Sequence, residues 1–474
     1  MQEPARVAID LGAESCRVSL LRWAAGVPVV EIVYRIANGP RRRGNLLYWP
    51  LQEILAGLEE GLRKAAAAVP EGIASIGVDG WSVDYVRLGP DGKMLREPFC
   101  YRDERTAESK QVADAIVSPF EIYQRTGAFP VALNTVYQLM ADATQGVDRR
   151  APWAMFPEFV LYWLSGRRVA EYTNATHTGL VNLKTGAWDA ELFEMLDLAM
   201  EAAPSLVPTG TVLGQIEGPL AALDAFSGTQ IIAPAAHDTA SAIAGIAEDM
   251  NSTAYISSGT WSLVGAITET PVTTLQAFDA GYTNIGAAGC GLLFHSQVNS
   301  MWVLKQCMEA WAAAGRPWSI ERLVQEAAAC NATVGVLDMD APALMLDTEM
   351  PQRINRELTR LGFDTIPDVA GNEPKFARTI FESLARRYAS SLANLEKMLG
   401  RKLERIHMIG GASRNRLLIA LTEKQTGLKV EIGETESATV GNLAIQLAAS
   451  ESGGGGVTAA AIRKWAKRLC KSRE

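Results

Sequence analysis

Several motifs that mark common enzyme classes are missing from this sequence. Its six cysteines are scattered and form no Cys-x-x-Cys pair, so neither a cysteine zinc site nor a disulfide framework is indicated. The four histidines have no metal-ligand spacing, and no His-Glu-x-x-His motif occurs. A Gly-x-x-x-x-Gly-Lys-Ser/Thr phosphate loop is also absent. Any metal or nucleotide site must therefore be built from other residues.

Basic charge and long apolar runs are also scarce. The formal net charge is -8, with 45 Lys and Arg against 53 Asp and Glu, which argues against a nucleic-acid-binding surface. No run approaches the roughly 18 apolar residues that span a bilayer, and no basic segment followed by an apolar core begins the chain. We therefore expect a cytoplasmic protein, a monomer or homodimer, that binds neither nucleic acid nor a membrane.

The length of the chain predicts two domains. Its 474 residues, 48% of them hydrophobic, exceed what one core usually serves, and domains of about 200 residues are the natural expectation. We place an N-terminal domain at residues 1–245 and a C-terminal domain at residues 246–450. A glycine-rich link and a short basic helix follow at residues 451–474. A cleft between the two domains is expected.

Apolar periodicity in the first part of the chain predicts strands, then a helix, then a strand. Residues 7–10 have the pattern of a short buried strand, and residues 17–23 and 29–34 add two more strands in an antiparallel meander. Residues 51–69 carry apolar side chains at helical spacing, and residues 73–79 return to a strand pattern.

The second half of the chain repeats this beginning. Strand patterns surround Gly259 as they surround Gly12, and aligning the two glycines puts Ser15 opposite Ser262. The duplication predicts two similar α/β lobes, which suit hinged closure over a nucleotide. The predicted elements of this half are strands at 253–256, 263–267 and 405–409 and helices at 298–314, 320–330 and 376–399.

Two glycine turns end strand patterns and are candidates for phosphate binding. They are residues 10–15 (DLGAES) and residues 257–262 (SSGTWS). Glycine has no Cβ, so backbone N–H groups can approach a phosphate closely. A single glycine after a strand is more often only a turn, but a pair in register within a duplicated chain favours phosphate binding.

Asp238 follows an apolar run at residues 231–234 and precedes a helix of small residues, so its carboxylate is presented at a strand end. Transfer of a γ-phosphoryl group to an alcohol requires a carboxylate that accepts the hydroxyl proton, and Thr239 could orient it. We predict that Asp238 is this base, although helix N-capping is the more common role for that position. Asp10 is the predicted Mg²⁺ ligand, through water, and its alternative is an ordinary strand-end aspartate.

Two further groups of residues have the character of ligand contacts. Trp81, Ser82 and Asp84 follow a strand and offer an aromatic wall and polar contacts for a small polyol, although a core tryptophan with a turn aspartate fits equally well. Gly410 and Gly411 lie between a strand and a helix, where a flat stretch of backbone can accept an adenine ring. A plain turn is the alternative for this pair.

Five further segments, together with the glycine turns, resemble the FGGY carbohydrate kinases of the actin-like ATPase superfamily, and among these the rhamnulokinases. The likeness runs from about residue 7 to residue 449, and such a set in this order is highly specific for the family. The segments are IGVDGWSVD at 76–84, YRDERT at 101–106, IYQRTG at 122–127, EYTNAT at 171–176 and HDTASA at 237–242.

The resemblance implies two ribonuclease H-like domains with a central cleft, the cofactors ATP and Mg²⁺, and phosphate transfer to the 1-hydroxyl of L-rhamnulose in rhamnose metabolism. It assigns sugar binding to the N-terminal domain, nucleotide binding to the C-terminal domain and proton acceptance to Asp238. The implied sugar contacts are Ser82, His237, Asp238, Thr239 and Gln297, in addition to Trp81 and Asp84. The implied ATP contacts are Ala13, Glu14, Ser15, Cys16, Arg17, Thr260, Lys305 and Gly411, in addition to Gly12, Gly259 and Gly410.

Four of these positions depart from the rhamnulokinase pattern. Ser82 and Cys16 replace glycines, Gln297 replaces asparagine and Lys305 replaces glutamine. A side chain at position 82 narrows the sugar pocket or adds a hydrogen bond, and the longer Gln297 reaches further into it. L-Fuculose, L-ribulose and xylulose therefore remain alternative substrates. A nucleotide-gated actin-like binding protein is the alternative from another class, but the chain lacks a separate peptide-binding domain.

Overall fold

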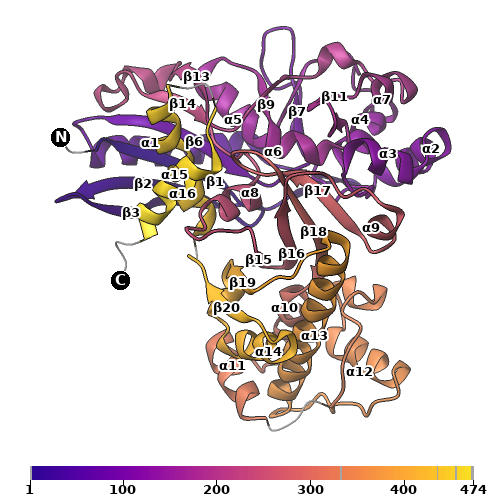
Figure 1. Ribbon diagram of the computed structural model, residues 1–474. Helices are drawn as coiled ribbons and strands as arrows, with labels where there is room; N and C mark the ends of the chain where they lie inside the picture. Colours follow the sequence, from indigo (N-terminus) through magenta and orange to yellow (C-terminus); the bar gives the residue numbers. More distant parts are fainter. Residues whose placement is uncertain (1–2, 331–333, 435, 454–455, 471–474) are drawn as a thin grey trace.

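The computed structural model describes residues 3–330, 334–434, 436–453 and 456–470, which form two lobes with a six-stranded sheet in each (Figure 1). In the first sheet, three antiparallel strands continue into parallel ones, as the predicted meander requires. The order across this sheet is β13 (Thr211–Gln215), β14 (Gln230–Ala233), β6 (Ile73–Gly80), β1 (Ala5–Leu11), β2 (Ser15–Ala24) and β3 (Val27–Ala37).

The second sheet repeats this arrangement. Its order is β17 (Tyr282–Gly286), β18 (Leu292–Asn299), β16 (Trp261–Thr268), β15 (Thr253–Ser258), β19 (Arg405–Ile409) and β20 (Lys429–Ile432). Strands β18, β16 and β15 are antiparallel, and β15, β19 and β20 are parallel, as β3, β2, β1, β6 and β14 are in the first sheet. The two α/β lobes predicted from the repeated glycine turns are therefore confirmed.

Helices flank both sheets, most of them where apolar periodicity predicts them. The helix predicted at 298–314 is wrong at its start, because Val298 still pairs with Ser262 in the β16–β18 ladder. The major helices of the first lobe are α1 (Leu51–Ala68) and α5 (Phe156–Ser165); those of the second are α10 (Met301–Ala313), α11 (Ile320–Ala329), α12 (Met350–Arg360), α13 (Glu373–Leu399) and α14 (Arg416–Thr426).

A long connection between β6 and β14 adds a second layer of structure to the first lobe. It contains segments that sequence periodicity did not predict, because most of them are shorter than eight residues. They are β7 (Tyr85–Arg87), α2 (Thr106–Ile116), α3 (Pro119–Thr126), α4 (Thr135–Ala141), β8 (Trp153–Met155), β9 (Val169–Glu171), α6 (Tyr172–Ala175), a 3-10 turn at Thr176–Thr178, β10 (Val181–Asn182), β11 (Ala187–Trp188), α7 (Ala190–Met195) and β12 (Ser205–Val207).

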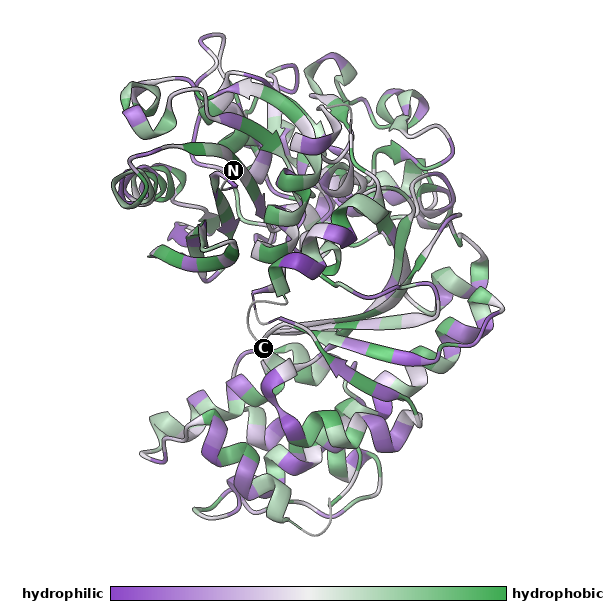
Figure 2. Ribbon diagram, turned by 60° about the vertical axis from the view of Figure 1, so that its left-hand side comes forward, coloured by the Kyte–Doolittle hydropathy of each residue, from purple (hydrophilic) through white to green (hydrophobic). Residues whose placement is uncertain are grey.

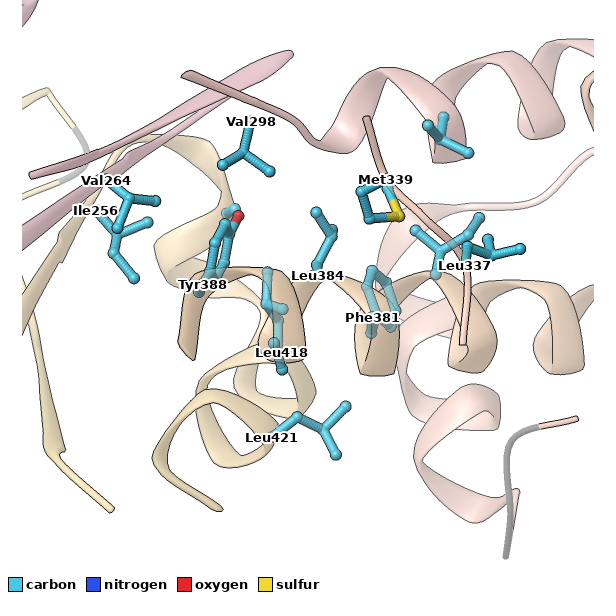
Figure 3. Packing of buried hydrophobic residues seen from close by; sticks show 14 of the residues in the cluster. Ile256, Val264, Val298, Leu337, Met339, Phe381, Leu384, Tyr388, Leu418 and Leu421 are labelled. Atoms are coloured by element: carbon cyan, nitrogen blue, oxygen red, sulfur yellow. The ribbon is translucent and has the colours of Figure 1, made fainter. Parts of the chain in front are cut away.

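The long helix α13 provides much of the core of the second lobe. Figure 3 shows Tyr388 of this helix beside Val264 and Ile256 of the sheet, with Leu384 and then Phe381 further along the helix. All five side chains are fully buried, so they are a major source of the free energy that stabilises the lobe. Apolar residues also follow the strands of both sheets, while hydrophilic residues gather on the outer helices (Figure 2).

The last described segments of the chain return to the first lobe. Helix α15 (Ser437–Ser452) packs against α8 (Asp238–Ala244), and α16 (Ala459–Cys470) lies beside them (Figure 1). In α15, Gln446 Nε2 donates a hydrogen bond to the carbonyl oxygen of Val7 at 2.9 Å. In α16, Trp465 meets Trp23 of β2 with 6.5 Å between ring centroids. The second lobe is thereby tied to the sheet of the first.

The domain limits at residues 245 and 450 stay predictions, since α15 and α16 contact the lobe opposite to the one that their place in the sequence suggests. The predicted terminal segment, residues 451–474, contains α16, and its residues 454–455 and 471–474 lie outside the described residues. Across the described part of the chain, no helix combines the length and apolarity that a bilayer crossing requires.

Candidate active site

Strand register aligns three charged residues across the first sheet. Asp10 on β1 is paired in register with Arg17 on β2 and with Asp79 on β6. Arg17 Nη1 lies 3.4 Å from Asp10 Oδ2, and the same guanidinium forms an ion pair with Glu436, the residue before α15. The row therefore connects the first glycine turn with a segment that comes from the second lobe.

The two carboxylates of this row hold a proton more tightly than usual. Burial raises the pKa of Asp10 to about 6; the charge of Arg17 opposes this shift and the charge of Asp238 adds to it. Burial, together with repulsion from Asp10, raises the pKa of Asp79 well above its ordinary value, although Asn442 Nδ2 donates to its Oδ2 at 2.6 Å. Asp79 Oδ1 is buried without a hydrogen-bond partner. Such a pair favours a bound cation.

Asp238 is the first residue of α8 and follows the end of β14. Its Oδ1 accepts hydrogen bonds from the backbone N–H of Thr239 at 2.5 Å and from Thr239 Oγ1 at 3.2 Å. The side chain keeps 38% of its surface accessible, but protein surrounds it on most sides. This desolvation raises the pKa of Asp238 to about 6, while the Thr239 hydrogen bonds oppose the shift. At pH 7 the carboxylate is mostly ionised and able to accept a proton.

Helix capping does not account for Asp238. The N-cap position of α8 belongs to His237, which makes no side-chain capping bond, and the polar contacts of Asp238 Oδ1 are with the adjacent residues Thr239 and His237. The backbone just before it is held by a different group, because Ala236 N–H donates to Glu171 Oε2 at 2.9 Å. Neither carboxylate oxygen of Asp238 therefore caps the N-terminus of α8.

A cavity of about 650 Å³ opens between the lobes next to this residue. Ser82, His237 and Thr239 line it from the first lobe, and Gln297 lines it from β18 of the second. The cavity continues to Gly259, so it connects the predicted sugar contacts with the second glycine turn. Four separate segments of the chain therefore meet at one space large enough for a monosaccharide.

The walls of this cavity differ in character. On the first lobe, Val83, Phe129 and Val131 give an apolar surface. On the second lobe, Arg387 Nε donates to Asp340 Oδ2 at 2.6 Å, so an ion pair faces the same space. A ligand with both C–H and hydroxyl surfaces suits such a lining.

Two predicted sugar contacts, Trp81 and Asp84, lie behind the cavity wall. Asp84 is fully buried and accepts hydrogen bonds from Trp49 Nε1 at 2.5 Å, from Trp81 Nε1 at 2.9 Å and from Gln138 Nε2 at 3.2 Å. Burial raises its pKa to about 6, and these three donors oppose the shift. Trp81 packs between Trp49 and Phe156, with its ring tilted against both. Their direct contact with a sugar stays a prediction, while their packing supports the segment that carries Ser82 just after the end of β6.

The predicted ATP contacts of the first turn adopt different environments. A Cβ at Gly12 would lie 2.5 Å from the Ser15 carbonyl oxygen, so the turn requires glycine there. Glu14 is exposed and its Oε1 lies 2.6 Å from Lys305 Nζ on α10, which links the first turn with the second lobe. Cys16 is fully buried, so only its backbone is available to a nucleotide. Ala13, Ser15 and Arg17 are partly exposed beside them.

The second turn gathers the remaining predicted ATP contacts. Gly410 has φ 84° and a Cβ there would lie 2.6 Å from the Ser258 carbonyl oxygen, so this glycine packs directly beneath the turn. Gly411 has open space around it, and Gly259 and Thr260 are exposed or partly so. These backbone groups form one surface at the ends of β15 and β19, which suits a nucleotide that contacts backbone atoms.

The register of the two turns corrects one predicted equivalence. Leu11 pairs with Cys16 in the first hairpin, whereas Ser258 pairs with Ser262 in the second. The second turn is one residue shorter, so Ser262 corresponds to Cys16 and not to Ser15. The glycine alignment was right, but strand pairing after each turn depends on loop length, which alignment of the glycines alone does not reveal.

Three residues of the site were missed by sequence reasoning. Asp79 ends a predicted strand as Asp10 does, and that shared pattern could have identified it. His177 hydrogen-bonds to His237, but the histidines were considered only for metal-ligand spacing. Glu436 pairs with a residue 419 positions away, and no local signal could predict such a contact.

No group of three or more His, Cys, Asp or Glu side chains in the described ranges is arranged to hold a metal ion. Mg²⁺ does not require such a group, since it commonly binds through one or two carboxylates, water and substrate phosphates. The adjacent buried Asp10 and Asp79, with an unpartnered oxygen on Asp79, fit that mode of binding. The residues present are therefore compatible with a hydrated magnesium ion.

Models of one protein family match almost the whole chain. The N-terminal domain of the FGGY family of carbohydrate kinases matches residues 5–245, and the C-terminal domain of the same family matches residues 254–450.

Curated relatives of similar length include bacterial rhamnulokinases. The chain is 33% identical to the rhamnulokinase of Bacteroides thetaiotaomicron over 442 residues, which cover 93% of this chain and 89% of that protein. It is 31% identical to the rhamnulokinase of Bacillus subtilis over 444 residues, which cover 94% and 90% of the two chains.

Solved structures share the fold at lower identity. A ligand-bound xylulose kinase from Lactobacillus acidophilus aligns with a TM-score of 0.77 at 20% identity and covers 99% of this chain and 98% of its own. The glycerol kinase of Plasmodium falciparum with ADP aligns with a TM-score of 0.77 at 14% identity and covers 98% and 92%. The two-lobed arrangement is thus that of known kinases.

Proposed function

The chain belongs to the FGGY family of carbohydrate kinases, and from this premise we propose that it phosphorylates the 1-hydroxyl of L-rhamnulose with Asp238 as the general base. Membership of the family makes it an ATP-dependent sugar kinase. The rhamnulokinases that match almost its full length support the choice of sugar. The observation on which the proposal depends most is the interlobe cavity, where Ser82 and Gln297 converge with His237 and Thr239, the residues on either side of Asp238.

In the proposed mechanism, Asp238 accepts the proton of the sugar hydroxyl as the new P–O bond forms. Thr239 holds Oδ1 through two hydrogen bonds, so the carboxylate is oriented before substrate binds. With a pKa of about 6, Asp238 is basic enough to take the proton and is still mostly ionised at pH 7. As pH falls through about 6 the base becomes protonated, and kcat should fall with it.

The first turn supplies the charged groups that a phosphoryl transfer needs. Arg17 lies between two acidic partners, Asp10 and Glu436, with a guanidinium that can turn toward a phosphate. Asp10, with Asp79 beside it, would hold hydrated Mg²⁺, and that ion when bound neutralises phosphate charge. The exposed backbone of Gly259, Gly410 and Gly411 would hold the nucleotide.

The identity of the sugar depends on two side chains that face the cavity. Ser82 and Gln297 both line it, and both depart from the rhamnulokinase pattern. A polar group that is left unpaired by the wrong sugar lowers kcat/KM strongly, so these two residues can redirect preference to another ketose. We expect the highest kcat/KM for L-rhamnulose in a panel with L-fuculose, L-ribulose, L-xylulose and D-xylulose. A tenfold preference for another member would change the substrate but not the class of reaction.

The replacement Asp238→Asn tests the proposed base most directly. It keeps the size of the side chain but removes its basicity, so we expect kcat to fall by about 10³-fold, in the range for loss of a general base. Sugar affinity by calorimetry and the melting temperature should change little. The exposed Asp364→Asn is a matched control with no expected effect. Full activity of the Asp238→Asn enzyme would exclude this residue as the base.

A further inference from the structure

A pair of histidines, both of which line the interlobe cavity, lies beside the proposed base. His177 Nε2 is 3.0 Å from His237 Nδ1, and their ring centroids are 4.0 Å apart. On the other side of the second ring, His237 Nε2 is 3.1 Å from Asp238 Oδ1. The three side chains thus form a line from the 3-10 turn at Thr176–Thr178 to the first residue of α8.

Protonation decides how this line affects the carboxylate. Burial lowers the pKa of His237 to about 3 and that of His177 well below its ordinary value, so both rings are neutral and each carries one N–H. If His237 donated from Nδ1 to His177, its bare Nε2 would face the carboxylate oxygen, which is repulsive. If His177 donates from Nε2, His237 carries its proton on Nε2 and presents it to Asp238. Electrostatics favours the second arrangement.

The segment that carries His177 is fixed at several points. Its carbonyl oxygen accepts a hydrogen bond from Asn134 Nδ2 at 3.1 Å, and the neighbouring Thr176 Oγ1 accepts one from Gly286 N–H of the second lobe at 2.9 Å. Glu171, five residues before Thr176, holds the backbone N–H of Ala236 at 2.9 Å. The same short segment therefore supports both the backbone before Asp238 and the ring beside it.

We propose that His177 is a positioning residue for the phosphoryl transfer, which fixes the tautomer of His237 so that its Nε2–H faces the carboxylate of Asp238. The inference rests on the proposed role of Asp238 as the base. The segment EYTNAT, which the sequence resemblance singled out without a function, ends immediately before this histidine. The role of His177 would be to keep Asp238 in one orientation while the sugar is bound. In other active sites a hydrogen-bond partner likewise fixes the tautomer of a histidine.

Other charged and titratable groups around the base have separate positions. Asp10 and Asp79 approach it from the first sheet, and Arg17 with Glu436 from the first turn and the start of α15. His295, on β18, affects the pKa of His177 and is itself bonded to Tyr255 OH at 2.9 Å. The ring of His177 lines the interlobe cavity and makes its polar side-chain contact, among the described residues, with His237 Nδ1, so a tautomer-specific measurement can separate its influence from that of the charged groups.

The replacements His177→Phe and His177→Gln form the kinetic test. Phenylalanine fills similar space without a donor, so we expect kcat to fall about 5- to 30-fold, the loss for one buried hydrogen bond, with KM for the sugar little changed. Glutamine places an amide N–H2 near the position of Nε2 and should restore kcat to within about threefold, which is less than the effect of one such bond. An H177Q enzyme as slow as H177F, or H177F at full kcat, would overturn the proposal.

Nitrogen NMR of histidine-labelled protein measures the tautomer itself. The chain has only four histidines, so single replacements assign their signals. We expect His237 of the unaltered protein to carry its proton on Nε2 and to become a mixture of tautomers in H177F. Proton occupancy on Nδ1 in the unaltered protein would refute the inference even if H177F failed to fold. His407→Gln, at a buried histidine of β19, is the matched control that should leave the His237 signals and kcat unchanged.

The two proposals fail in distinguishable ways. Full activity of the Asp238→Asn enzyme would reject Asp238 as the base, and the proposed positioning role of His177 would be rejected with it. An inactive Asp238→Asn enzyme together with an unaltered His237 tautomer and unaltered kcat in H177F would leave the base in place and reject His177 alone.

Discussion

The two glycine turns fold alike but carry different chemistry. In the first, the paired residues before and after the turn are Asp10 and Arg17; in the second, the corresponding ladder pair is Ser257 and Leu263. The charged pair is continued by Asp79 on the next strand. The two copies therefore share a backbone arrangement, and the charges to which we assign a part in phosphoryl transfer occur in only one of them.

Hydroxyl groups take the place of charge beneath the second turn. Ser262 Oγ lies 2.8 Å from Ser258 Oγ and 2.6 Å from Tyr388 OH, and it donates to Ser300 Oγ at 2.7 Å. All four are buried, and the network is neutral. A neutral, hydrogen-bonded support suits the proposed role of the second turn, which is to hold the nucleotide through backbone groups, whereas the charged side chains at the first turn suit the proposed metal ion and reacting phosphate.

The largest difference should appear when the ladder pairs are altered. Asp10→Asn removes a negative charge that we propose binds Mg²⁺. We therefore expect kcat to fall about 10²- to 10³-fold, as for loss of one electrostatic contact to the transition state. Ser257→Ala, at the matching position, should cost less than about tenfold, because it removes at most one neutral hydrogen bond. Steady-state rates over a range of Mg²⁺ concentrations measure both. Equal losses would mean that the turns share the charged role.

A smaller contrast is expected between the two glycines. In Gly12→Ala the new Cβ would lie 2.5 Å from the Ser15 carbonyl oxygen, so the backbone must shift, and we expect a loss of about 1–3 kcal/mol in the free energy of unfolding. The nearest atom to a Cβ at Gly259 is 3.8 Å away, so Gly259→Ala should fold normally. Thermal denaturation measures the difference. A destabilised Gly259→Ala would show that this turn is tighter in solution than its geometry suggests.

The comparison also shows which parts of the site a sequence can predict. Strand ends, glycine turns and the helix at Asp238 depend on local patterns, and the structure has them where periodicity predicted them. The unequal crowding of Gly12 and Gly259 depends on a carbonyl oxygen three residues on in one case and on a shorter loop in the other. The length of each turn between paired residues and the distance between its backbone atoms are properties of the folded chain, so the repeated sequence pattern did not reveal them.

Contacts between distant segments were beyond sequence reasoning for a different reason. The ion pair of Arg17 with Glu436 and the hydrogen bond of Asp79 with Asn442 both require α15 to return to the first lobe. Apolar periodicity predicts that a helix is buried but not which sheet it covers. Trp81 illustrates the same limit, since an aromatic residue after a strand is as compatible with a core as with a sugar-binding wall.

The smallest effect should come from Lys305, an exposed side chain of the second lobe that reaches the first turn. Lys305 and Glu14 are 43% and 68% exposed, and exposed ion pairs contribute little to stability, so Lys305→Met should leave the melting temperature unchanged. A cation at this position can still attract the polyphosphate, and we expect KM for ATP to rise about two- to fivefold at low salt and less at high salt, because ions screen an exposed charge. Rates against ATP concentration at two ionic strengths measure this, with the exposed Lys375→Met as the matched control. A lower KM for ATP in Lys305→Met would mean that the Glu14–Lys305 pair obstructs the nucleotide. The second lobe would then obstruct the first turn through α10, in addition to offering the backbone groups of its own glycine turn.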